Sequence, residues 1–90
     1  MAKNTGMPRV SLHYWAGAKA AAGTDCEIVD ADSIEEALNK AISRRQDPRF
    51  EGVISASSLL LNGSVIAKAD RNLPLFEDVT IEILPPFAGG

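Results

Sequence analysis

The sequence predicts an α+β domain in which a mixed sheet of four to five strands carries one main helix packed across one face. Apolar and polar residues alternate near both ends of the chain, at 9–15 and 79–84, which is typical of half-buried strands. Between them, residues 34–42 repeat apolar side chains at the three- and four-residue spacing of a helix. Layering such a helix on the sheet buries both patterns in one core, and ninety residues suffice for one domain.

The first predicted strand begins at Arg9 and turns Val10, Leu12 and Tyr14 towards the core. The alanine-rich stretch 16–23 is bracketed by glycines, so we expect one helical turn or a connecting loop there. Residues 26–29 resume β character. The turn at 24–25 therefore opens an antiparallel pair of strands.

The main helix begins after Ser33, which with Glu36 three residues later forms a capping-box pattern. We expect the helix to end at 46–48, because Pro48 disfavours the helical conformation in the residue before it. An irregular connection then tucks Phe50 and the apolar residues 53–54 against the core.

The dipeptide Asn62-Gly63 favours a two-residue type I′ turn, and it predicts a hairpin between strands at 58–61 and 64–67. Residues 70–77, with Pro74, form a loop before the last strand. The order strand, strand, helix, hairpin, strand allows the first and last strands to lie side by side at the centre. This arrangement is the β-grasp, or ubiquitin-like, roll.

Composition excludes several function classes. The net charge is −3 and the basic residues are scattered, which argues against a nucleic-acid surface. The sequence has no apolar run of membrane-spanning length and no signal-peptide pattern, so we expect a cytoplasmic protein without membrane contact. His13 stands alone, and Cys26 has no basic or histidine neighbour in sequence, so we expect no catalytic residue and no metal site.

The domain organisation predicted is a flexible leader at 1–8, a β-grasp domain at 9–84 and an extended tail at 85–90. The tail ends in Gly89-Gly90, whose lack of side chains lets the Gly90 carboxylate enter a narrow channel, with Gly89 providing clearance. Pro85 and Pro86 favour an extended geometry that holds the tail away from the body. A frayed end is the alternative interpretation.

Strand phase predicts an apolar patch at the root of this tail. Trp15 and Leu84 both fall on the otherwise polar face of the sheet, and Val65 or Ile66 from the hairpin extends the patch. The alternative is that residues 16–23 or the segment near Phe50 cover them. Our hypothesis is that the patch docks partner proteins. The tail residues that contact a partner with it are Pro85, Pro86, Phe87 and Ala88, of which Phe87 anchors the tail.

These features resemble the small sulfur-carrier family with a ubiquitin-like fold, which includes the small subunit of molybdopterin synthase and the thiamine sulfur carrier. The matching segments are the first strand and alanine-rich turn at 10–23, the Ser33-capped helix, the turn at 61–63, Pro74-Leu75 and the ending at 83–90. The Pro-Pro-x-x-Gly-Gly ending is more similar to the molybdopterin synthase subunit. One departure is Glu77-Asp78-Val79, where the family usually has a Gly-Asp turn; Asp tolerates a left-handed conformation better than most residues.

The resemblance implies a carrier cycle. A ubiquitin-activating-type adenylyltransferase would use ATP to adenylate Gly90, and a sulfur donor protein would convert it to a thiocarboxylate. The large, catalytic subunit of molybdopterin synthase would then pass the sulfur to a pterin precursor, while the carrier itself binds no cofactor. The alternatives are a carrier for thiamine or cysteine synthesis, a conjugated protein modifier, or a ubiquitin-like interaction module whose tail is never activated.

Overall fold

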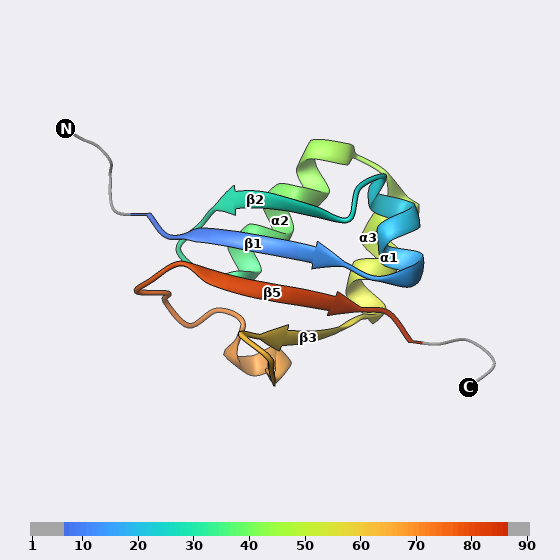
Figure 1. Ribbon diagram of the computed structural model, residues 1–90. Coiled ribbons are helices and arrows are strands. Elements are labelled where there is room, and N and C mark those ends of the chain that lie inside the picture. The colour runs from blue at the N-terminus through green and yellow to red at the C-terminus, as the bar shows by residue number, and fades with distance from the viewer. Residues whose placement is uncertain (1–6, 87–90) are drawn as a thin grey trace.

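A computed structural model of the chain describes residues 7–86 and shows a five-stranded mixed sheet with helices on one side (Figure 1). The strand order is β2-β1-β5-β3-β4, and β1 and β5 run parallel at the centre while the other pairs are antiparallel. The strands are β1 (Arg9–Tyr14), β2 (Cys26–Asp30), β3 (Ser58–Leu61), β4 (Ser64–Val65) and β5 (Val79–Leu84). The predicted β-grasp fold is confirmed.

The alternating pattern of the two central strands places every second side chain in the core. The buried residues of β1 are Val10, Leu12 and Tyr14, and those of β5 are Val79, Ile81 and Ile83. Their register is fixed by the parallel pairing, in which Val10 lies opposite Val79 and Tyr14 opposite Ile83. The other side chains of β1 and β5 therefore all face the uncovered side of the sheet.

The longest helix, α2 (Ile34–Arg45), begins as predicted at Ser33, whose hydroxyl accepts the Glu36 backbone N–H at 3.1 Å. The second half of the predicted capping box differs. The Glu36 carboxylate accepts the backbone N–H of Asp32 at 2.7 Å, one residue before the expected donor. The buried residues of α2 are Ile34, Ala37, Leu38 and Ala41.

The prediction of an irregular connection near Phe50 is wrong, because a second full helix, α3 (Pro48–Ala56), occupies this segment. Asp47 caps it by accepting the Arg49 N–H at 2.9 Å, and Pro48 takes the first helical position, where no N–H is needed. Phe50 and Ile54, four residues apart, are its buried pair. Helix α2 ends with Gln46 in a left-handed conformation, φ 50°, two residues before Pro48 starts α3.

The alanine-rich stretch is also more regular than predicted. It forms the seven-residue helix α1 (Ala16–Ala22), which buries Ala18 and ends at Gly23 with φ 80°. In the hairpin, Asn62 and Gly63 have φ 48° and 92°, and both values are positive as a type I′ turn requires. The strand after this turn is shorter than expected, since β4 ends at Val65 and a 3-10 turn, η1 (Lys68–Asp70), follows.

The helices lie together behind the sheet, so the opposite face is open (Figure 1). At the β2 edge, Lys40 Nζ donates to the Asp30 carbonyl at 2.7 Å, and the Thr24 hydroxyl donates to the Cys26 carbonyl at 3.1 Å. Covering edge carbonyls in this way disfavours pairing with another strand. No helix among residues 7–86 is long and apolar enough to cross a bilayer.

The chain joins the sheet at Pro8, which is buried and accepts the Ala31 N–H at 3.0 Å. The start of β5 is tied to the start of β1 by the Asp78 carboxylate, which accepts the Arg9 N–H at 2.9 Å. Asp78 is not among the described residues with positive φ. The departure at 77–79 therefore leaves β5 in its expected place without a left-handed turn.

Candidate functional site

The open face of the sheet carries an apolar surface where β1 and β5 end, which we call the docking patch and define as Trp15, Leu60, Leu84 and Val65. Trp15 follows β1 directly, and its backbone N–H donates to the Ile83 carbonyl at 3.2 Å. Because Tyr14 pairs with Ile83, the next residues along, Trp15 and Leu84, lie side by side. Trp15 is 49% exposed and Leu84 is partly exposed.

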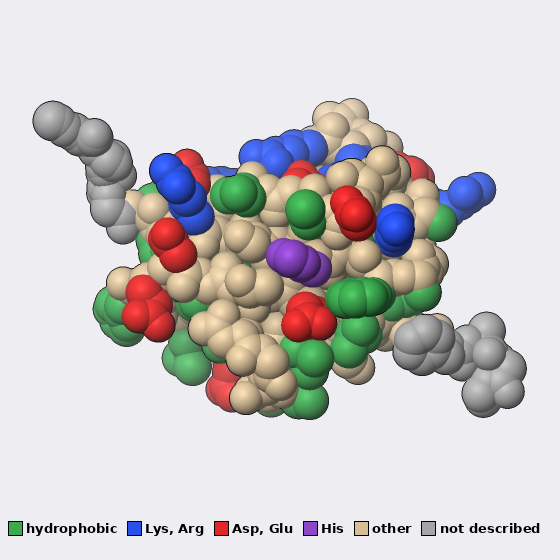
Figure 2. All heavy atoms as spheres, in the orientation of Figure 1, with side chains coloured by type: hydrophobic (Ala, Val, Ile, Leu, Met, Phe, Trp, Pro, Cys, Tyr) green, Lys and Arg blue, Asp and Glu red, His purple; other side chains and the backbone are tan. Residues whose placement is uncertain are grey.

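Val65 is connected to the rest of the docking patch by Leu60, a residue that the sequence pattern does not predict for this site. Leu60 pairs with Glu82 on one side and with Val65 on the other, so it fills the space between β5 and β4. Val65 is 78% exposed. Three successive leucines, 59–61, give no alternation from which the phase of Leu60 could be read. Figure 2 shows hydrophobic side chains gathered on this part of the face, beside the histidine and an acidic group.

The two segments that could have covered the docking patch, residues 16–23 and the segment near Phe50, do not cover it. Phe50 is fully buried on the helix side of the sheet, where its ring meets Tyr14 edge to face at a centroid distance of 5.7 Å. Helix α1 begins after Trp15 and packs against α3, and it leaves half of the indole exposed. Within the described part of the chain, neither segment covers the patch.

The root of the tail is only partly as predicted. Pro86 is exposed, whereas Pro85 is buried, so Pro85 belongs to the body and does not hold a free stem away from it. As a buried residue, Pro85 offers a partner little surface. The predicted site residues Phe87, Ala88, Gly89 and Gly90 lie outside the described residues.

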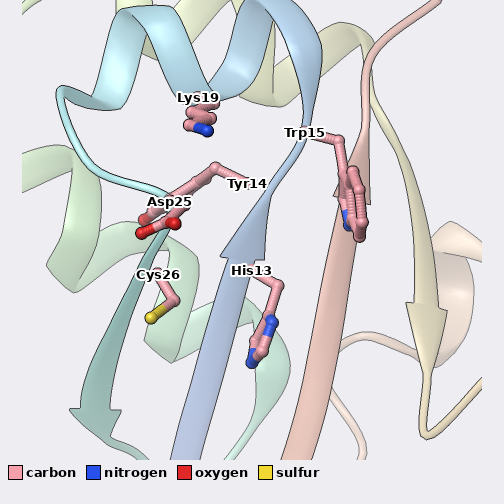
Figure 3. Close-up of a pocket in the computed structure, with 6 residues that line it drawn as sticks. All are labelled: His13, Tyr14, Trp15, Lys19, Asp25 and Cys26. Atoms are coloured by element: carbon pink, nitrogen blue, oxygen red, sulfur yellow. The ribbon is translucent and has the colours of Figure 1, made fainter.

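Beside Trp15, a hollow of about 270 Å³ opens between the end of β1, the start of β2 and α1 (Figure 3). Its lining residues are His13, Tyr14, Trp15, Lys19, Asp25 and Cys26. His13 pairs directly with Cys26 across the two strands, so the expectation that Cys26 has no histidine neighbour holds in the sequence and fails in space. Cys26 is exposed, and no hydrogen bond joins it to His13 in the described structure. Among residues 7–86, no cluster of His, Cys, Asp and Glu could hold a metal ion.

Behind the hollow, an ionic cluster fixes the end of β1 against the helices. Glu27 accepts a hydrogen bond from the Tyr14 hydroxyl at 2.7 Å and pairs with Arg45 at 2.5 Å and with Arg44 at 2.8 Å. Arg45 also donates to the carbonyls of Ala22 and Ala41, each at 3.1 Å. The Arg45 guanidinium, carried by α2, thus joins this helix to α1 and to β2.

The charges in this cluster shift two pKa values in opposite directions. Burial, together with the hydrogen bond to Glu27, raises the pKa of Tyr14 well above its usual range, so its hydroxyl stays protonated. Burial also tends to raise the pKa of Glu27. Hydrogen bonds from Arg45, Tyr14 and Arg44 outweigh that effect and lower the Glu27 pKa. Glu27 is therefore ionised at neutral pH, and its ion pairs and the hydrogen bond from Tyr14 hold the strands to α2.

No protein-family profile and no curated protein sequence matches the chain. Solved structures do match it. Small archaeal modifier protein 1 from Methanosarcina acetivorans is 23% identical with a TM-score of 0.76, covering 93% of this chain and 98% of its own. The same protein from Haloferax volcanii is 19% identical with a TM-score of 0.74, covering 91% and 99%.

A third likeness is to a chain in the complex of subunits 1 and 2 of molybdopterin-converting factor from Helicobacter pylori. It is 21% identical with a TM-score of 0.64, over 91% of this chain and 99% of the other. At these identities the likeness is one of fold. The chain therefore shares the ubiquitin-like β-grasp fold of small archaeal modifier protein 1 and of this molybdopterin-converting factor chain.

Proposed function

We propose that this chain is a sulfur carrier of the molybdopterin synthase small-subunit type, with the Gly90 carboxylate as the group that carries sulfur. The observation that carries the proposal is the position of β5. This strand is held by β1 on one side and β3 on the other, ends at the docking patch and leads directly into Pro85-Pro86 and the diglycine. A partner seated on the patch would receive the tail from a fixed point.

The docking patch supports this proposal because it gathers four apolar side chains on a face where the two central strands otherwise present polar residues. Trp15, Leu60 and Leu84 lie near those polar residues, which are Ser11, His13, Thr80 and Glu82. Clustered apolar side chains on such a face are typical of an interface. Its place at the tail root fits two successive partners: the adenylyltransferase that activates the tail and the synthase large subunit that uses it. The likeness to a molybdopterin-converting factor complex of subunits 1 and 2 supports the second partner.

The chemistry proposed takes place on partners. The Gly90 carboxylate attacks ATP in a ubiquitin-activating-type enzyme, which forms an acyl-adenylate and releases pyrophosphate. Hydrosulfide-level sulfur from a donor protein then adds to the acyl carbon, AMP leaves, and a thiocarboxylate remains. The large subunit next transfers this sulfur to a pterin precursor for the molybdenum cofactor. The carrier supplies no catalytic residue and no cofactor of its own, and we place the cycle in the cytoplasm.

A second function has a specific observation in its favour. The similar structures from Methanosarcina acetivorans and Haloferax volcanii are small archaeal modifier proteins. We therefore also consider a modifier whose Gly90 is joined to a lysine of another protein through an isopeptide bond. Both functions begin with the same adenylate, so they differ only in the nucleophile that displaces AMP.

The test is the intact mass of the full chain after incubation with its adenylating enzyme, ATP and a sulfur donor. The mass increase expected for exchange of one oxygen by sulfur supports the carrier, and a chain lacking Gly90 is the matched control. Covalent joining to lysine-bearing proteins supports the modifier instead. A persistent free acid with active enzyme and ATP would leave only an interaction module. If adding the large subunit leads to transfer of the sulfur to the pterin precursor, the carrier serves molybdenum cofactor synthesis and not thiamine or cysteine synthesis.

A further inference from the structure

The loop before β5 exposes two large apolar side chains far from the tail. We call residues 71–77 the far loop. In it Leu73 is 58% exposed and Phe76 is 90% exposed, the highest value among the large apolar residues described. The loop lies at the end of the sheet where β5 begins, opposite the end from which the chain leaves towards the C-terminus (Figure 1). The Leu73 and Phe76 side chains therefore belong to a surface separate from the docking patch.

The far loop is held in place by contacts on both sides of these residues. The Leu75 N–H donates to the Asp32 carbonyl at 2.7 Å, and the Arg71 carbonyl accepts the Glu35 N–H at 2.9 Å. Leu75 packs on the core, and Arg71 is only 8% exposed. The loop is thus bonded to the start of α2 at two points. It presents Leu73 and Phe76 on a fixed backbone, which lowers the entropy cost of binding.

The charged side chains around Leu73 and Phe76 are mainly negative. Lys68 and Arg9 are the exposed cations near them among the described residues. Glu35 is beside the loop by its bond to Arg71, and Glu77 follows Phe76 directly. Figure 2 shows hydrophobic and acidic side chains next to each other at this end of the molecule. The exposed carboxylates at this end are Asp32, Glu35, Asp70, Glu77 and Asp78.

We propose that the far loop is a second docking element, and that its occupant is the adenylating enzyme, through an apolar pocket bordered by Lys or Arg. This inference rests on the proposed function. Two terminal glycines have no side chains by which an enzyme could select this protein. The adenylating enzyme, which binds the carrier before any modification, must therefore recognise the body of the carrier. Apolar side chains with an acidic rim fit a basic rim around an apolar pocket.

The size of the sheet allows one enzyme to reach both surfaces. The six residues of β5 span about 20 Å at roughly 3.3 Å per residue. A standard interface covers about 800 Å² on each partner, which is a patch about as wide as this strand is long. The adenylating enzyme therefore holds the tail at one end of the sheet and the far loop at the other.

The experiment measures the affinity of the purified adenylating enzyme for the full chain by calorimetry without ATP, so that adenylation of Gly90 contributes no heat. The test variant is Leu73→Ser with Phe76→Ser, and the control is Ile28→Ser, an exposed apolar residue on the opposite edge strand. We expect the double variant to bind about tenfold more weakly or worse, as for anchors in other interfaces, and the control to bind within about threefold of the original. Asp70→Lys with Glu77→Lys should also weaken binding, and high salt should reduce that difference.

Each other outcome overturns the inference. If the original chain binds and the loop variants bind equally well, the far loop is not a docking element, while the proposed function stands. If the original chain neither binds nor is adenylated, the proposed function fails with it. If the double variant does not fold, Asp70→Lys with Glu77→Lys decides, and unchanged affinity of that charge-reversed variant overturns the inference. A dimer in sedimentation that Phe76→Ser disperses would assign the loop to a second copy.

Discussion

Replacing Trp15 with alanine measures what the docking patch contributes to binding. Aromatic side chains bury about 150–250 Å² each, and Trp15 is 49% exposed, so about 100 Å² of indole remains for a partner to cover. At about 25 cal/mol per Å² this area amounts to about 2.5 kcal/mol. The affinity for the molybdopterin synthase large subunit should fall by roughly 60-fold, since about 1.4 kcal/mol corresponds to a factor of ten.

The same substitution also tests the fold, because the other half of the indole is buried. We expect the free energy of unfolding to fall by up to about 2.5 kcal/mol by the same area argument, which leaves a domain of this size folded at low temperature. Val65→Ser avoids this complication. With 78% of its surface exposed, Val65 contributes little to the core, and its loss from the interface should cost about 1 kcal/mol, or roughly fivefold in affinity.

The assay is isothermal calorimetry at a temperature where circular dichroism shows each variant to be folded. Ile28→Ala is the control, because Ile28 is 59% exposed on the same face but belongs to the β2 edge. Its affinity should stay close to that of the original chain. If both Trp15→Ala and Val65→Ser bind the large subunit as tightly as the original chain, the docking patch is not the interface and the reasoning from strand phase is refuted.

Three further predictions concern stability. Arg45→Met keeps the aliphatic stem but removes the ion pair with Glu27 and both carbonyl contacts, so urea unfolding should show a loss of about 3 kcal/mol; a loss below about 1 kcal/mol contradicts the bridging role. Because the folded-state pKa of Glu27 lies below the ordinary glutamate value of 4.5, its contribution to stability is present above pH 4.5 and is lost as pH falls through the folded-state pKa. Glu27→Gln should flatten that part of the acid-unfolding curve, and an unchanged slope argues against the pKa shift. Gly63→Ala should cost about 1 kcal/mol because φ is 92°, whereas Gly52→Ala, in open space within α3, should stabilise by about 0.5–1 kcal/mol; calorimetric melting with equal signs for both would contradict the assigned backbone conformations.

The elements that could be predicted from the sequence are those whose signals are local. Alternation gave the phase of β1 and β5, Asn62-Gly63 gave the hairpin, and Ser33 gave the start of α2. Each of these patterns depends on residues a few positions apart. The element that was missed, α3, also has a local signal, since Asp47-Pro48 is a cap followed by a first-turn proline. The same proline disfavours the helical conformation in the residue before it, so in the sequence it indicates the end of one helix as readily as the start of the next.

The parts of the candidate site that could not be predicted depend on register between distant strands. Cys26 meets His13 because β1 and β2 pair antiparallel, and Leu60 joins the docking patch because it pairs with both Glu82 and Val65. A shift of one residue in either pairing would turn these side chains to the other face. The burial of Pro85, directly after β5, likewise depends on tertiary packing and not on a local sequence pattern.

The arrangement of helices gives the open face its importance. Helices α1, α2 and α3 all lie on one side of the sheet, and Arg45 ties α1 and α2 together behind β1. Among residues 7–86, no helix covers the opposite side of β1 and β5. Its middle is polar and the docking patch lies at the end where both strands finish, whereas the far loop lies at the other end of the sheet, hydrogen-bonded to the start of α2. A carrier whose tail must enter another protein's active site needs a rigid body that can be gripped without covering the tail. A central strand fixed on both sides and accessible on one face provides that body.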